Sequence, residues 1–416
     1  MIDYRKYRLA NGLTLLTHEA WDTPLASLCL LYNVGSRDEN PSRTGFAHLF
    51  EHLMFGGTQA VPDFDMVVNA MGGECNAFTN CDYTCYYMTV PSGVLGDALA
   101  LEVDRMTGLE IDEKTLAVQQ RVVTEEYHQR YMNQPYGDVW LLLRPLCYKT
   151  HPYRWATIGA DIRHVSEATL DDVQAFHRRF YRPDNAILAV AAPMHHDEIA
   201  DMVAGRFASP VKSCIAISAD VTDMGYANAA GLWQEPEQTA LRMLRVQRAV
   251  PATKVFVAYP ICSYGEPLYR AYDLITDILG NGTSSRMYRQ LVIEKGMMSE
   301  ADAYLSGDCG PGLLILSGTL TQGVTPEDGI EALREMATGL SSLTTRELQK
   351  VQNKYENTFV FSQYKASDRA CGLCHYTWLG DTSLVNREPI MYRSITLDDM
   401  RNAASTVFQP QKENIL

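Results

Sequence analysis

The sequence predicts an α+β fold with two homologous, α/β-sandwich-like domains that arose from an internal duplication. Three observations predict it. Two pairs of segments match between the halves of the chain, strand-like and helix-like patterns alternate in both halves, and 416 residues exceed one ordinary domain. Helices are expected to cover one face of each sheet.

The first pair of matching segments begins with a strand-like run. Residues 26–39 are followed by a helical pattern and by Gly-Gly-Thr at 56–58, and residues 254–266 are followed in the same way by Asn-Gly-Thr at 281–283. Short apolar runs bounded by polar and turn residues are typical of strands. We therefore expect a strand followed by a helix at corresponding places in the two halves.

The second pair aligns without a gap. Residues 169–183 and 396–410 both begin Thr-Leu-Asp-Asp and end in Pro. Each copy predicts a helix that has Thr as its N-cap, acidic residues in its first turn and an end before Pro. A strand is expected after each helix, at 186–192 and from 414 onward.

These repeats predict a first domain at 1–215 and a homologous second domain at 235–416. The Gly-, Ala- and polar-rich stretch 224–238 is the expected linker between them.

The composition argues against several partners. The chain carries 36 basic and 50 acidic residues, a formal net charge of -14, which disfavours binding to nucleic acid or to an anionic membrane. We find neither an apolar run long enough to span a bilayer nor an apolar secretory signal, so a cytoplasmic location is expected. The ten scattered cysteines are expected to be mostly reduced.

Residues 45–55 have the apolar spacing of a helix and contain His48, Glu51 and His52. Residues three and four apart share a helix face, so both imidazoles can reach one Zn²⁺ ion. Glu51 would stand beside that ion, placed to take a proton from water. The spacing H-x-x-E-H is that of an inverted zincin motif. The alternative is a helix with two partly buried histidines.

A third ligand must come from another segment, and residues 115–129 offer one. A single helical stripe there is formed by Leu116, Gln119, Val123 and Glu126. Glu125 falls on the adjacent stripe, so spacing alone leaves the choice between the two carboxylates open. A solvated acidic pair on a surface helix is the alternative.

Taken together, these motifs resemble those of the pitrilysin-type zinc peptidases, the group of insulin-degrading enzyme and mitochondrial processing peptidase. The chain looks most like short bacterial members with two homologous domains. The resemblance covers nearly the whole chain and rests on residues 48–58, 72–79, 119–126, 180–185 and 280–291.

The resemblance implies specific roles. In that family the residues matching His48, His52 and Glu126 bind Zn²⁺, and the residue matching Glu51 is the general base. Gln119 stands where members usually carry a Glu that helps to orient the site. An amide there can hydrogen-bond but brings no negative charge.

The resemblance also implies a substrate site and a chamber. The edge strand that pairs with an extended peptide corresponds here to Asn76, Ala77, Phe78 and Thr79. The expected function is a zinc-dependent endopeptidase that hydrolyses peptides or small unfolded proteins. The chain would form half of a clam-shell chamber, completed by an identical or homologous subunit.

One departure bears on activity. Active relatives carry an Arg and a Tyr in the second half that stabilise the transition state, and here the matching positions are Val292 and Ser299. In some two-chain relatives the partner supplies this pair, although Tyr304 or another donor could substitute. The alternative function is therefore a non-catalytic scaffold or assembly subunit.

A second alternative comes from Cys371-Gly-Leu-Cys374-His375, which matches the pattern for covalent haem attachment. A chance match within a helix is the better interpretation, because haem attachment normally needs export. The same Cys-x-x-Cys pair lacks the βαβ context of a redox motif.

Overall fold

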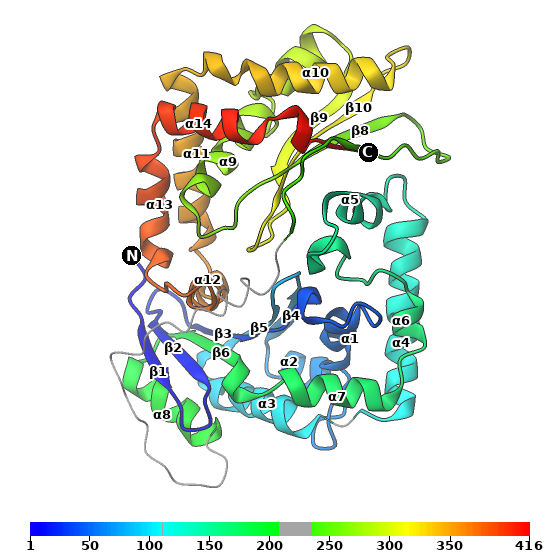
Figure 1. Cartoon of the computed structure of the whole chain (residues 1–416). Coiled ribbons are helices and arrows are strands. Elements are labelled where there is room, and N and C mark those ends of the chain that lie inside the picture. The colour runs from blue at the N-terminus through cyan, green and yellow to red at the C-terminus, as the bar shows by residue number, and fades with distance from the viewer. Residues whose placement is uncertain (110, 208–234) are drawn as a thin grey trace. The chain divides into compact units, whose positions relative to one another are not determined.

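The computed structural model describes residues 1–109, 111–207 and 235–416 (Figure 1). Two compact units make up the chain. Unit 1 contains Met1–His128, the described part of 155–230 and Val360–Arg387. Unit 2 contains Gln129–Arg154, the described part of 231–359 and Glu388–Leu416. Both units combine helices with a mainly antiparallel sheet, so the predicted two-domain α+β fold is confirmed.

Unit 1 is built on a six-stranded sheet with the order β1-β2-β6-β3-β5-β4. β2 and β6 run parallel and the other neighbours run antiparallel. β6 is buried along its whole length, whereas β4 lies at an edge with alternating exposure. The strands are β1 (Arg5–Arg8), β2 (Thr14–Glu19), β3 (Leu25–Tyr32), β4 (Glu74–Thr79), β5 (Thr84–Pro91) and β6 (Ala186–Ala192).

Helix α7 of unit 1 begins with the Thr cap that the sequence predicts. In α7, the Thr169 hydroxyl accepts from the amide of Asp172, whose carboxylate accepts from the Thr169 amide in return. The helices are α1 (Phe46–Leu53), α2 (Phe64–Ala70), α3 (Leu95–Gly108), α4 (Glu113–Tyr127), α6 (Arg163–Ser166), α7 (Leu170–Phe180), α8 (His196–Phe207) and α12 (Ala366–Leu379).

Unit 2 is built on a five-stranded sheet with the order β7-β11-β8-β10-β9. Its strands are β7 (Arg242–Met243), β8 (Lys254–Pro260), β9 (Met298–Leu305), β10 (Leu313–Leu320) and β11 (Asn414–Ile415). Its helices are α5 (Val139–Cys147), α9 (Pro267–Leu279), α10 (Pro326–Thr338) and α14 (Leu397–Val407), and α11 (Thr345–Ser362) and α13 (Leu384–Ser394) continue across the division between the units.

The two sheets repeat one topology. In both units the strand after the Thr-capped helix runs parallel to one neighbour and antiparallel to the other: β6 lies between β2 and β3, and β11 lies between β7 and β8. The next two strands follow in the same order, β5-β4 and β10-β9. α14 repeats the capping arrangement of α7 through Thr396 and Asp399. This shared order is the structural counterpart of the sequence repeat.

The units do not consist of two continuous halves of the chain. α12 belongs to unit 1, where it packs on β3 and β6, and α5 belongs to unit 2, where it packs beside β7 and β11. The first residues of α5 and α12 are 227 positions apart (366 − 139), the offset that also relates Thr169 to Thr396 (396 − 169). Relative to the predicted domains 1–215 and 235–416, equivalent helical segments are thus exchanged. The expected linker 224–238 lies mostly outside the described residues.

Candidate metal centre

α1 carries the first three predicted site residues, and the buried carboxyl group of Glu39 holds its start. Glu39 accepts hydrogen bonds of 2.9 Å from the amides of both Gly45 and Ala47, which begin the helix. Gly45 has a φ of 89°, and a Cβ atom there would lie 2.7 Å from the carbonyl oxygen of Ile158. Glycine is therefore required at this position by conformation and by space.

The opposite face of α1 packs against aromatic rings. Phe50 stacks on Phe176 of α7 at a centroid distance of 5.2 Å and on Tyr181 at 4.9 Å. The Tyr86 hydroxyl donates to the carbonyl oxygen of Phe50 at 3.2 Å. These contacts fix the rotation of α1 about its axis, and thereby the direction of its histidine face.

α4 positions Glu126. Its N-cap is Asp112, and Leu116 and Val123 are buried, as the predicted stripe requires. The side-chain amide of Gln120 donates to the carbonyl oxygens of Val165 and Ala168, both at 2.9 Å. After Tyr127 the chain continues as a π-helical turn, His128–Met132. Such turns are frequent at functional sites.

His48, His52 and Glu126 converge. Glu126 Oε2 lies 3.6 Å from His48 Nε2 and 3.2 Å from His52 Nε2, and the two imidazole rings are nearly perpendicular. Zinc bonds of about 2.1 Å set the ligand atoms of a tetrahedral site about 3.4 Å apart. The side chains are 11%, 24% and 15% exposed, respectively, which leaves an approach from solvent. The donor set and its spacing therefore fit Zn²⁺.

The structure separates Glu126 from its neighbour. Glu126 faces α1 and lies with the two histidines, while Glu125 is exposed. Glu51 is half-buried on α1, directly before His52. Burial raises the pKa of Tyr181, and the negative charge of Glu51 adds to this effect. Gln119 is half-buried and lies about two helical turns before Glu126.

Asn76, Ala77, Phe78 and Thr79 lie on the edge strand β4, which packs near α1. One side of β4 pairs with β5. Asn76 and Phe78 point to the exposed face, and the Asn76 side-chain oxygen accepts from the amide of Ala77 at 2.8 Å. The predicted substrate strand is thus a sheet edge in the same unit as the metal centre.

Val292 and Ser299 belong to unit 2. Val292 lies in the π-helix Tyr288–Glu294 and packs partly against the hydrophobic core. Ser299 is exposed on β9 and donates to the carbonyl oxygen of Thr319 at 3.4 Å. Burial raises the pKa of Tyr304, on the same strand, to about 12.

Sequence reasoning missed Glu39 and Gln120. Burial raises the pKa of Glu39 to about 8, although its bonds to Ala47 and Gly45 favour the charged form. Both side chains bind backbone groups of other segments, and only the folded chain brings those segments near. A glutamate six residues before a glycine that opens a helix is a weak signal by itself.

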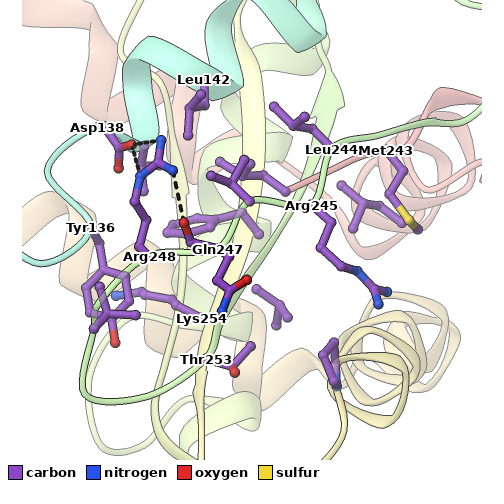
Figure 2. A pocket seen from close by; sticks show the side chains of 18 of the residues that line it. Tyr136, Asp138, Leu142, Met243, Leu244, Arg245, Gln247, Arg248, Thr253 and Lys254 are labelled. Carbon is purple, nitrogen blue, oxygen red and sulfur yellow. Dashed lines mark hydrogen bonds and ion pairs between the residues drawn. The ribbon is translucent and has the colours of Figure 1, made fainter.

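A cavity of about 410 Å³ is lined by residues of unit 2 alone (Figure 2). Figure 2 shows Arg248 directed at Asp138, with which it forms a hydrogen bond of 2.9 Å. Arg245 pairs with Glu327, and Lys254 lies 5.5 Å from the centre of the Tyr136 ring. The cationic side chains around the cavity are thus engaged by neighbouring side chains.

Within the described ranges, every helix is too short or too polar to cross a bilayer.

Comparison with known proteins identifies the family. The family model "Insulinase (Peptidase family M16)" matches residues 14–141, and "Peptidase M16 inactive domain" matches residues 167–355. The zinc protease PqqE of Helicobacter pylori is 26% identical over 413 residues, which are 96% of this chain and 89% of that protein.

Solved structures share the fold. A protease from Helicobacter pylori has a TM-score of 0.89 at 24% identity, with 100% of this chain and 99% of that one covered. An M16-like peptidase from Alicyclobacillus acidocaldarius has a TM-score of 0.80 at 18% identity and covers 100% and 97%. The two family matches, the zinc-protease relative and this common fold lead to one conclusion: the chain belongs to the insulinase family of peptidases, M16.

Proposed function

We propose that the chain is a zinc-dependent endopeptidase, or the metal-bearing subunit of one. The observation that carries the proposal is the approach of Glu126 Oε2 to the Nε2 atoms of His48 and His52 at tetrahedral ligand spacing. The names of curated relatives, such as zinc protease PqqE, support the same activity.

In this proposal His48, His52 and Glu126 hold the ion. Zinc in such a site supplies Lewis acidity, which makes water a better nucleophile near neutral pH. Glu51, next to His52 on α1, accepts the proton of the attacking water and returns it to the leaving amine. The aromatic contacts of Phe50 fix the rotation of α1, so the helix face that carries Glu51 and both histidines keeps its direction.

We assign peptide binding to the edge of β4. An extended substrate would add as a further strand beside Asn76–Thr79 and so present its backbone near α1. A backbone-directed site of this kind suits peptides and unfolded segments, because folded proteins rarely expose a free extended strand.

A scaffold role is the second candidate. It is favoured by Val292 and Ser299, which cannot stabilise an oxyanion as Arg and Tyr would, and by the match to an inactive-domain model. Under the first proposal these positions imply a partner, identical or homologous, that completes a shared chamber and supplies the missing groups.

Peptide hydrolysis tests the activity. The zinc-loaded chain is expected to cleave a mixture of quenched fluorescent peptides, and Glu51→Gln is expected to lower kcat/KM by at least about a hundredfold, because the proton acceptor is lost. Zinc content should be unchanged in that variant. Wild-type chain that binds zinc but leaves every peptide intact, alone and with a homologous partner, would favour the scaffold role.

Metal binding tests the ligand set separately. Glu126→Gln should weaken zinc binding by at least about a hundredfold, measured by competition with a chromophoric chelator. Glu125→Gln is the matched control, since it makes the same change one position away on the exposed side of α4, and it should bind zinc as the wild type does. Equal affinities for the two variants would remove Glu126 from the proposed centre.

A further inference from the structure

A second group of potential metal ligands lies in unit 1. Cys29 on β3, Cys85 on β5 and Cys371 on α12 bring their Sγ atoms within 4.8 Å of one another. The Sγ atoms of Cys29 and Cys85 are 3.0 Å apart. Within the described part of the chain, this group and the His48–His52–Glu126 centre are the two sets that could hold a metal ion.

The strand register explains how the first two thiols meet. Cys29 is opposite Tyr87 and Cys85 is opposite Leu31, so the two cysteines are diagonal neighbours on one face of the sheet. α12 packs on the same strands and brings Cys371 down onto that face. The cluster therefore depends on the exchange that places α12 in unit 1.

A fourth thiol lies beside the cluster. Cys374 follows Cys371 by one helical turn and is fully buried, as are Cys29 and Cys85. Its Sγ donates to the carbonyl oxygens of Cys29 at 3.3 Å and Ile187 at 3.6 Å. Because residues three apart share a helix face, the Cys-x-x-Cys spacing places both thiols on the side of α12 that meets the sheet.

We propose that Cys29, Cys85 and Cys371 form a binding site for a thiophilic d¹⁰ cation, Cu(I) or Zn(II). Metal–sulfur bonds of about 2.3 Å set the sulfurs of such a site about 3.8 Å apart, so the observed separations need only small side-chain adjustments. Soft thiolate ligands favour these ions. A bound cation would also offset the negative charge of the thiolates, which would be costly to bury together without one.

The fourth thiol, Cys374, distinguishes the two ions by the number of ligands that each needs. Cu(I) is satisfied by the three converging sulfurs. Zn(II) in a closed site takes four ligands, which Cys374 completes if its side chain turns from the two carbonyl oxygens to the cluster. In both cases the ion fastens α12 to β3 and β5.

The first test is metal content with a spectroscopic readout. The full chain, purified under reducing conditions from medium supplemented with copper and zinc, should show an ultraviolet thiolate-to-metal charge-transfer band. Cys371→Ser should lose this band and about one metal ion per chain. Glu126→Gln should keep the band, because the histidine centre has no sulfur ligand. Cys147→Ser, which alters a buried free cysteine of unit 2, is the matched control and should also keep it.

Cys374→Ser distinguishes the ions. It should release the metal if the site holds zinc and should retain it if the site holds Cu(I). Wild-type and Cys371→Ser chains with the same metal content and no charge-transfer band would overturn the proposal. So would a disulfide between Cys29 and Cys85 in the chain as purified.

A second measurement avoids any folding defect in the variants. In the folded wild-type chain, Zn²⁺ or Cu(I) should protect Cys371 from alkylation by iodoacetamide, as read by peptide mass spectrometry. Cys75, a half-buried thiol outside the cluster, serves as the internal reference and should react equally with and without metal. Unchanged alkylation of Cys371 in the presence of both ions would also overturn the proposal.

Discussion

At the scale of single residues, Glu39 should make the free energy of unfolding depend on pH. Its folded-state pKa of about 8 lies above the ordinary value of 4.5 because the carboxyl is buried at the start of α1. Between these values the folded chain keeps a proton that the unfolded chain releases. The free energy of unfolding should therefore fall by at most ~1.4 kcal/mol per pH unit from this group as pH rises through that window.

Glu39→Gln should remove this dependence, since an amide does not titrate. Denaturant unfolding of both chains at about pH 5, 6.5 and 8 gives the measurement. The stability of the variant relative to the wild type should increase toward pH 8. Parallel pH profiles would mean that Glu39 is already ionised in the folded chain.

The residues of the centre were predictable to different degrees. Helical spacing alone predicts that His48, Glu51 and His52 share a face. Spacing does not choose between Glu125 and Glu126, because they lie on adjacent stripes, and the family resemblance was needed to favour Glu126. Glu39 was not predictable, because its partners are backbone amides of a turn that exists only after folding.

At the scale of elements, α1 depends on the backbone of its N-cap residue, Gly45. Gly45→Ala should lower the free energy of unfolding by about 1–3 kcal/mol, because alanine must adopt a positive φ and meets the carbonyl of Ile158. Gly205→Ala on α8 is the control. It has open space for a Cβ and should stabilise the chain by up to about 1 kcal/mol.

Zinc affinity of the Gly45→Ala chain is the informative second readout. If α1 shifts to relieve the clash, His48 and His52 move with it and the affinity falls. A chain as stable as the wild type would show that the turn before α1 can relax, and that this glycine does not fix the helix.

Several elements follow directly from local sequence. The Thr-Leu-Asp-Asp segments predict the caps of α7 and α14, and both form. Local sequence does not determine on which of the two sheets α5 and α12 pack. An amphipathic pattern shows that a helix has an apolar face, but it does not say which of two similar sheets that face will cover.

At the scale of the whole molecule, the exchange of α5 and α12 determines what can fold alone. A fragment of residues 1–215 would lack α12 and expose the faces of β3 and β6 that it covers. We expect this fragment and the fragment 235–416 to be individually unstable and to form structure when produced together. Far-ultraviolet circular dichroism and denaturant unfolding measure this. Cooperative unfolding of 1–215 alone would contradict the expectation.

The duplication itself was predictable because two segment pairs keep their spacing across the chain. It explains why one topology occurs twice while a single copy carries His48, His52 and Glu126. The corresponding helix of unit 2, α9, instead uses Asp273 to accept a hydrogen bond of 2.8 Å from the Tyr392 hydroxyl. The two copies thus share a topology while different side chains occupy corresponding helices.

The position of α12 also has a consequence during synthesis on the ribosome. β6 completes the first sheet by residue 192, yet the helix that covers it ends at residue 379. At ordinary elongation rates this interval lasts roughly ten to forty seconds. Throughout it the apolar residues of β3 and β6 lack the helix that finally covers them, so chaperones that recognise such segments have a defined period in which to act on this chain.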